Sequence, residues 1–142
     1  MVEINDILAS VNERSKTSVI RELLKKTAEP GIISFAGGLP DPKAFPVKEI
    51  KEVIDKILTE KADKALQYGP TEGLKDLKDE LIKLLKEEEI NLDQDNILVT
   101  TSSQQGLELV GRAFIDLGDT IIVSNPSYMG ALQVFKSYGA KM

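Results

Sequence analysis

The sequence predicts an α/β fold with a parallel sheet. From residue 96 onward, short aliphatic and β-branched runs alternate with amphipathic stretches, in the order strand, helix, strand, helix, strand. This alternation is typical of right-handed crossovers in a parallel sheet. The glycine-rich signatures of common dinucleotide-binding and P-loop folds are absent, which argues against these two kinds of α/β fold. The expected strands are 97–101, 120–124 and 141–142.

The composition fits a soluble globular protein with one sizeable core. The chain has 142 residues, of which 42% are hydrophobic and 29% charged. A net charge of -5 without a basic cluster argues against nucleic-acid binding. No apolar run approaches membrane-spanning length and the N-terminus lacks the pattern of a signal peptide, so we expect a cytoplasmic protein without a membrane partner.

The absence of two residue types limits the chemistry. With no Cys and no His, the chain has no thiolate nucleophile, no imidazole base and none of the usual zinc ligands. We therefore expect no metal site. Any catalysis would depend on other side chains or on an organic cofactor.

The N-terminal part is predicted to be an arm, a helix and a stiff loop. Residues 1–16 are polar and weakly patterned, which predicts a loose arm with a short helical turn. Ser18 is a candidate N-cap for a helix that ends at Pro30. An extended segment from Ile32 then enters a loop rich in glycine and proline over 37–42.

Two longer helices are predicted in the middle of the chain. The first runs from about Val47 to Leu58, because aliphatic residues recur there at helical spacing. A solvated connection over 61–64 and a turn over 66–73 follow, and the second helix ends near Glu89. One face of the second helix carries a leucine stripe. Its other face is predicted to be solvated and consists of Lys75, Lys78, Asp79, Lys83 and Lys86.

Two junctions join a strand directly to a helix. The first strand leads through Ser102 and Ser103 into a helix, in which Gly106 and Gly111 are expected to allow close helix–sheet packing. The free N–H groups and the positive dipole end of such a helix can bind an anion such as phosphate. Taken alone, however, either serine is better explained as an N-cap. The second junction, at 125–128, also lies at the carboxyl end of a strand, where open α/β sheets bind ligands.

Four motifs follow one another along the chain. They are Phe-Ala-Gly-Gly-Leu-Pro-Asp-Pro (35–42), Gln-Tyr-Gly-Pro-Thr-Glu-Gly (67–73), Thr-Ser-Ser-Gln-Gln-Gly-Leu (101–107) and Asn-Pro-Ser-Tyr-Met-Gly (125–130). Together they resemble the N-terminal part of pyridoxal-phosphate-dependent aminotransferases of class I/II, with fold type I. The opening helix and Gly-Gly-Leu-Pro loop are most similar to the 2-aminoadipate/kynurenine-type branch. Each motif is weakly specific, but four in series are strongly specific.

The resemblance implies an incomplete fold type I structure. An N-terminal helical arm and a partial small domain would be followed by the first strands and helices of the parallel-sheet large domain. Residues 1–46 would form the arm, the helix and the substrate loop. Residues 47–142 would form further helices and the start of the cofactor-binding large domain.

The resemblance also implies a site for pyridoxal 5'-phosphate. Ser103 and Gln104 match the residues that hold the cofactor phosphate. Ser102 belongs to the same site but stands where the family usually has glycine, so a positive φ there would be strained. Tyr128 matches the aromatic residue that lies on the pyridine ring. Tyr68 matches a tyrosine that reaches the cofactor phosphate of the neighbouring subunit, which implies a homodimer.

Three further residues are implied to contact the substrate. Gly38 and Leu39 match the loop that closes over the substrate, with the glycine leaving room for a carboxylate. Arg21 resembles an arginine that meets an acidic substrate side chain as a bidentate donor. The alternative for Arg21 is a solvated surface residue, since the first turn of a helix disfavours a cation.

In the family, the Schiff-base lysine and the other catalytic residues lie beyond position 142, so no catalytic residue is assigned here. The first hypothesis is the N-terminal portion of an aminotransferase, inactive alone, that acts on an amino acid (2-aminoadipate, glutamate or an aromatic one) and a 2-oxo acid. A second is a truncated, non-catalytic module that associates through an unpaired sheet edge. A third is an unrelated α/β phosphate-binding domain.

Overall fold

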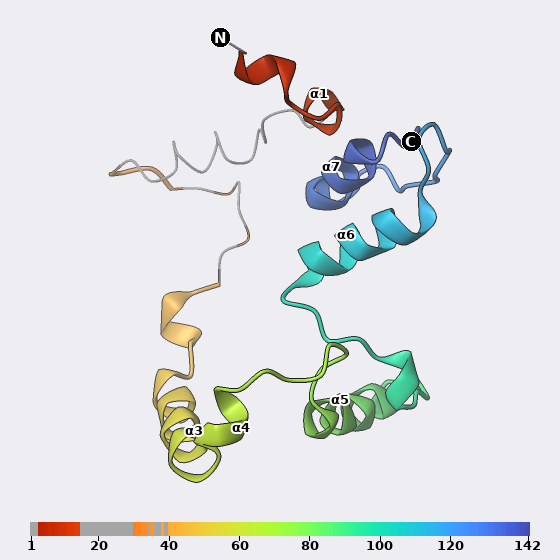
Figure 1. The fold of residues 1–142 in the computed structure, drawn as a ribbon. Coiled ribbons are helices and arrows are strands. Elements are labelled where there is room, and N and C mark those ends of the chain that lie inside the picture. The colour runs from red at the N-terminus through yellow and green to blue at the C-terminus, as the bar shows by residue number, and fades with distance from the viewer. Residues whose placement is uncertain (1–2, 15–29, 34, 36–37, 39) are drawn as a thin grey trace. The chain divides into compact units, whose positions relative to one another are not determined.

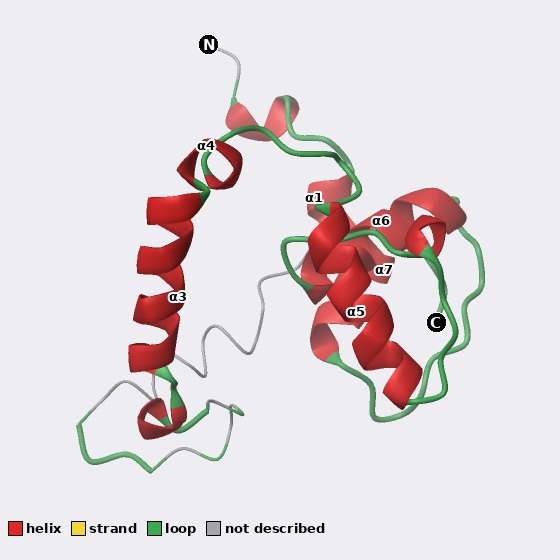
Figure 2. Cartoon of the chain, turned by 90° about the horizontal axis from the view of Figure 1, so that it is seen from below, coloured by secondary structure: helices red, strands yellow, loops and turns green. Residues whose placement is uncertain are grey.

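The computed structural model describes residues 3–14, 30–33, 35, 38 and 40–142, which form helices joined by turns (Figures 1 and 2). The helix predicted after Ser18 and the residue Arg21 lie outside the described residues. The elements in order are η1 (Ile4–Asp6), α1 (Val11–Arg14), η2 (Pro42–Ala44), α3 (Val47–Glu60), α4 (Ala62–Ala65), α5 (Lys75–Glu87), η3 (Gln94–Asn96), α6 (Ser103–Phe114) and α7 (Met129–Ser137).

The chain divides into two compact units. The terminal unit comprises Met1–Gly37 and Thr100–Met142, and the central unit comprises Gly38–Val99. The division into residues 1–46 and 47–142 concerns the domains of a whole enzyme and stays a prediction. Among the described residues, no helix has the length and apolarity that a membrane crossing requires.

In the central unit, α3 begins at Val47 as predicted and continues to Glu60. The predicted connection over 61–64 is solvated, with three of its four residues exposed, but it is not irregular, because the short helix α4 occupies most of it. The backbone of Lys61 (φ -143, ψ 29) leaves the helical region, while its N–H still donates to the carbonyl oxygen of Ile57 at 2.8 Å. The chain therefore bends at Lys61 and resumes a single helical turn.

The turn before α5 requires a glycine at position 73. Gly73 has a φ of +104, which side-chain-bearing residues rarely adopt, and a Cβ there would lie 2.7 Å from Cβ of Val99. The N–H of Val99 donates to the carbonyl oxygen of Glu72 at 3.0 Å. The segment 97–101 was predicted to be a strand. In the described part of the chain it forms a hydrogen bond to this turn and is not part of a β-sheet.

Lys78 is not on the solvated face of α5 to which the sequence assigned it. It is 7% exposed, whereas Lys75, Lys83 and Lys86 are exposed as predicted. Positions 74, 78, 81 and 85 recur at helical spacing, so Lys78 lies beside the leucine stripe. A lysine can occupy such a place because its methylene stem covers apolar surface.

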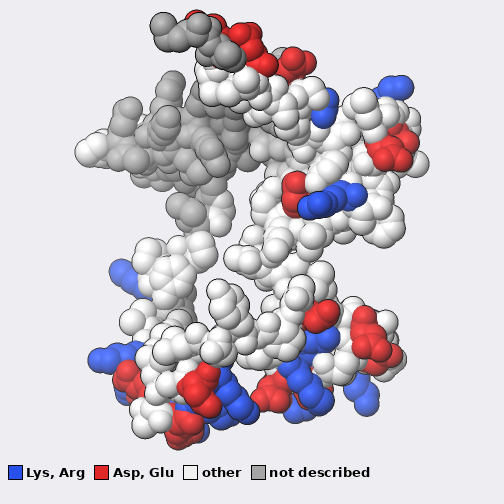
Figure 3. All heavy atoms as spheres, viewed as in Figure 1, with Lys and Arg blue, Asp and Glu red and all other residues white. Residues whose placement is uncertain are grey.

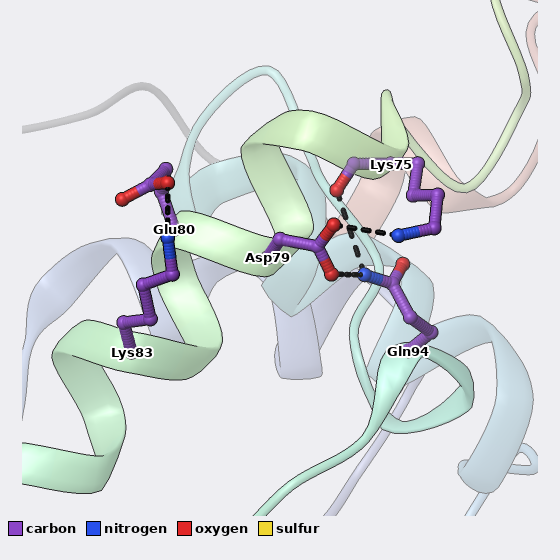
Figure 4. Close-up of polar contacts among 5 residues, drawn as sticks. All are labelled: Lys75, Asp79, Glu80, Lys83 and Gln94. Atoms are coloured by element: carbon purple, nitrogen blue, oxygen red, sulfur yellow. Dashed lines mark hydrogen bonds and ion pairs between the residues drawn. The ribbon is translucent and has the colours of Figure 1, made fainter.

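A polar cluster joins α5 to η3, as Figure 4 shows. The ammonium of Lys75 and the amide of Gln94 both donate to the carboxylate of Asp79, the former at 2.7 Å. The hydrogen bond from Lys75 lowers the pKa of Asp79 and, in turn, raises the pKa of Lys75. Just before Gln94, Asp93 forms a capping box with Asn96. Acidic and basic side chains lie next to one another over α5 and α3 (Figure 3).

In the terminal unit, α6 packs on α7 at Gly111. Gly111 is buried, and a Cβ there would lie 2.8 Å from Cδ2 of Tyr138 and 3.3 Å from Cγ1 of Val134. The hydroxyl of Tyr138 donates to Oε1 of Glu108 at 2.7 Å. The glycine was expected to allow helix–sheet packing, and in the described residues it allows helix–helix packing instead.

In the described part of the chain, the predicted parallel sheet is represented by one bridge. Thr120 pairs with Lys141 in parallel, through hydrogen bonds from Ile121 N–H to the Lys141 carbonyl (2.9 Å) and from Lys141 N–H to the Asp119 carbonyl (2.7 Å). Because α7 lies between these segments in the sequence, the second and third predicted strands begin to pair in the expected sense. Gly139, with a φ of +83, ends the helix as predicted.

The N-terminal arm was predicted to contain one short helical turn, and its described residues form two, η1 and α1. In α1, Nε of Arg14 donates to the carbonyl oxygen of Ser137 at 3.0 Å. This carbonyl belongs to the last turn of α7, where free carbonyl groups and the dipole favour a cation. Arg14 thereby attaches the arm to α7.

Candidate functional site

The first turn of α6 is built without backbone strain at Ser102. This residue precedes the helix in an extended conformation (φ -173, ψ 174), which any residue adopts. A serine in place of the family's usual glycine is therefore accommodated. Its side chain makes no capping hydrogen bond, so the N-cap explanation does not hold for Ser102.

The N–H groups of this turn are open. The first hydrogen bond of α6 runs from Gly106 N–H to the Ser102 carbonyl oxygen at 3.3 Å. Within the described part of the chain, the N–H groups of Ser103, Gln104 and Gln105 have no protein acceptor. These donors lie at the positive end of a 12-residue helix, beside two exposed serine hydroxyls. Such a combination is suited to an anion.

Neighbouring side chains hold the segment before the helix. Oε1 of Gln105 accepts from the Thr101 N–H at 2.6 Å, and the Thr100 hydroxyl donates to the Ser102 carbonyl at 3.0 Å. Gln105 was not predicted from the sequence to belong to this turn. The signal was present, since Ser102 and Gln105 have the spacing of a capping box, although here the glutamine bonds one residue further upstream.

The second junction presents Tyr128 at the start of α7. Tyr128 is the residue before the helix and is 63% exposed. Its ring lies over Gly130, where a Cβ would be 2.6 Å from Cε1 and 2.8 Å from the hydroxyl oxygen. The preceding turn is closed by the Ser124 hydroxyl, which donates to the Pro126 carbonyl at 3.0 Å.

Part of the predicted site lies within one compact unit. Ser102, Ser103, Gln104 and Tyr128 all lie in the terminal unit, at the starts of two helices that pack on each other. Tyr68 lies in the central unit between α4 and α5 and is 99% exposed. Gly38 is exposed, with nothing within 4 Å of a Cβ placed on it. Leu39 and Arg21 lie outside the described residues.

Comparison with known proteins decides the family. The family model described as aminotransferase class I and II matches residues 31–142. The chain belongs to this family. The resemblance of the four motifs is thus confirmed, and pyridoxal phosphate is the cofactor that this membership implies.

Individual aminotransferases match over nearly the whole chain. The 2-aminoadipate transaminase of Thermus thermophilus is 48% identical over 128 residues, covering 90% of this chain and 31% of that protein. Aromatic-amino-acid aminotransferase 1 of Thermococcus litoralis is 46% identical over 124 residues, covering 87% of this chain and 30% of that one. The chain therefore spans about a third of the length of these relatives.

A solved structure shares the backbone arrangement. The alpha-aminoadipate aminotransferase of Thermus thermophilus, complexed with N-(5'-phosphopyridoxyl)-L-leucine, matches with a TM-score of 0.85 at 41% identity. The match covers 99% of this chain and 33% of that one. This likeness supports the α/β class. The open N–H groups of α6 and the exposed ring of Tyr128 fit the phosphate and the ring of the implied cofactor.

Proposed function

We propose that this chain is the N-terminal portion of a pyridoxal-phosphate-dependent aminotransferase, which transfers an amino group between an amino acid and a 2-oxo acid. The observation that carries the proposal is the set of open N–H groups at the start of α6, inside the region that matches the family. The amino donor is 2-aminoadipate, glutamate or an aromatic amino acid. The names of the two relatives support the first and the last of these.

The chain's own residues would bind and orient the cofactor. Ser102, Ser103 and Gln104 would donate hydrogen bonds to the phosphate, through the serine hydroxyls and through N–H groups that have no protein acceptor in the described residues. Tyr128 would place its exposed ring against the pyridine. Pyridoxal phosphate, when bound, supplies an electron sink for amino transfer.

The remaining assignments belong to the intact enzyme. In the proposal, Gly38 and Leu39 form the substrate loop, and Arg21 pairs with an acidic substrate side chain. Tyr68 reaches the cofactor phosphate of a second subunit, in a cytoplasmic homodimer. The near-complete exposure of Tyr68 is consistent with a partner outside its own unit. The intact enzyme has fold type I, of which this chain supplies the N-terminal arm, part of the small domain and the start of the parallel sheet.

The chain alone is proposed to be inactive. A Schiff-base lysine needs a desolvated pocket next to the cofactor. Among the described residues, Lys78 is the buried lysine, and it lies beside the leucine stripe of α5 in the central unit. We expect no turnover of glutamate or 2-aminoadipate with a 2-oxo acid and added pyridoxal phosphate. Measurable turnover would refute this part of the proposal.

The cofactor site is tested by calorimetric titration of the 142-residue chain with pyridoxal phosphate. Ser103→Ala should weaken binding by about 10-fold or more, because a hydrogen bond to a charged group contributes about 1.5–3 kcal/mol. Tyr128→Ala should weaken it by about 2- to 10-fold, through lost stacking. Gln133→Ala, an exposed substitution on α7, is the matched control and should bind normally.

The same titration separates the two alternatives. If Ser103→Ala weakens binding and Tyr128→Ala does not, the unrelated phosphate-binding domain is the better description. If the chain binds no pyridoxal phosphate and light scattering finds stable oligomers, it is an interaction module. That alternative is favoured by aliphatic side chains exposed in the terminal unit, such as Ile122 at 99% and Leu117 at 75%.

A further inference from the structure

We propose that Gly130 is a positioning residue for the ring of Tyr128. This inference rests on the proposed function, since the ring is the group that would meet the pyridine. It assigns the orientation of that ring to Gly130, which would act on the cofactor through Tyr128.

Space, and not backbone conformation, explains the glycine at this position. The described glycines that adopt a positive φ are Gly31, Gly73, Gly118 and Gly139, and Gly130 is not among them. Gly130 lies in the first turn of α7, where alanine is about 1 kcal/mol more favourable than glycine in an ordinary helix. The advantage of glycine must therefore come from what lies over it.

The ring of Tyr128 lies over it. An ideal Cβ at position 130 would be 2.6 Å from Cε1, 2.7 Å from Cζ and 2.8 Å from the hydroxyl oxygen. All three distances are shorter than real Cβ contacts, so a methyl group at position 130 and the present ring position exclude each other. The half of the ring that carries the hydroxyl thus rests on the bare Cα of Gly130.

This contact can fix the ring although the side chain is 63% exposed. The two residues are separated by one position, so the contact is made as soon as the first turn of α7 forms. Any side chain at position 130 would rotate the Tyr128 ring away from the helix and change the face that it presents. The remaining exposed surface of the ring is what a planar ligand would contact.

The first measurement needs no cofactor. A proton above or below an aromatic ring is shifted upfield in its NMR spectrum by the ring current. The Gly130 Hα resonances should therefore be shifted upfield in the 142-residue chain, and Tyr128→Ala should abolish the shift. Gly106 Hα resonances serve as the control, because the nearest atom to a Cβ there is Thr100 Oγ1 at 3.9 Å.

The second measurement is a double-mutant cycle in cofactor affinity, measured by calorimetry with pyridoxal phosphate. Gly130→Ala should weaken binding by about 2- to 10-fold, which is the range that lost stacking allows. In a Tyr128→Ala background, the same substitution should cause no further weakening, since the ring it displaces is gone. A merely structural glycine would weaken binding equally in both backgrounds. Gly106→Ala should leave affinity unchanged.

Thermal melts show whether each variant is folded, so that loss of binding can be distinguished from unfolding. If Gly130→Ala unfolds the chain, the Tyr128→Ala/Gly130→Ala variant should fold again, because the clash has been removed, and this rescue supports the proposal. Absence of the upfield shift, or equal weakening in both backgrounds, overturns it. If the shift is present but the unmodified chain binds no pyridoxal phosphate, the proposed function fails and the role of Gly130 towards the cofactor fails with it.

Discussion

Gly111→Ala tests the packing of α6 on α7. The new methyl group would lie 2.8–2.9 Å from the ring of Tyr138 and 3.3 Å from Val134, so the ring must move. Overpacking of this kind costs about 1–3 kcal/mol. Displacement of the ring also breaks its hydrogen bond to Glu108, at a further cost of about 1 kcal/mol. The higher helix propensity of alanine offsets about 1 kcal/mol. The free energy of unfolding should therefore fall by about 1–3 kcal/mol.

Urea unfolding followed by far-UV circular dichroism measures this change. In a Tyr138→Ala background the severe clash is absent and the contact with Val134 at 3.3 Å needs only a small shift, so Gly111→Ala should stabilise the chain by up to about 1 kcal/mol through helix propensity. Gly106→Ala, in the same helix and with no atom closer than 3.9 Å, should be stabilising in both backgrounds. A Gly111→Ala variant that is destabilised equally with and without the tyrosine ring would show that the contact is not the cause.

Three further predictions concern other sites. Gly73→Ala should lower the free energy of unfolding in urea by about 2 kcal/mol or more, because its φ is +104. Glu89→Gly should raise the free energy of unfolding by about 1 kcal/mol, because Glu89 has a φ of 61. Glu88→Gly should not raise it, because Glu88 has a φ of -91. The hydrogen bond to Glu108 raises the pKa of Tyr138 above its usual 10.0. The stability that this hydrogen bond contributes is therefore fully present below pH 10.0 and is lost as the pH rises through the raised pKa. Ultraviolet titration should show that the pKa of Tyr138 is lower in the Glu108→Gln variant than in the unmodified chain.

The helices were predictable because their signals are local. The start of α3 follows from aliphatic spacing after Val47, and the end of α7 follows from Gly139, whose φ is +83. The error at Lys78 has a local cause too. The lysine was assigned by its charge, although its helical position lies beside the leucine stripe and its stem can pack there.

The strands were less predictable because a strand depends on its neighbours. The run 97–101 has the composition of a strand, yet a strand forms only where adjacent backbone supplies the hydrogen-bond partners. In the described residues, Val99 bonds to the turn at Glu72, and 120–124 pairs with Lys141 in a single bridge. Composition alone does not say which partner a strand will meet.

The candidate site shows the same difference between local and distant signals. The serines at the start of α6 were predicted from a strand-to-helix junction, which is a local pattern, whereas the role of Tyr128 at the start of α7 was predicted from the resemblance to a family. The extended backbone of Ser102 and the bond of Gln105 to Thr101 required the structure, because each depends on how one turn closes. Tyr68 and Gly38 were assigned by resemblance to a family, and their roles stay predictions because the described contacts of each residue carry no sign of a ligand.

The packing contact at Gly111 and the candidate cofactor site are physically connected. The start of α6 carries the open N–H groups and the start of α7 carries Tyr128, so the relative placement of the two helices sets the spacing between phosphate donors and ring. Tyr138 and Val134 fix that placement by resting on Gly111. If the proposed function is correct, Gly111→Ala should weaken pyridoxal phosphate binding as well as stability, and Tyr138→Ala should weaken it without a clash. Normal affinity in a folded Gly111→Ala variant would show that the two helix starts keep their spacing without this contact.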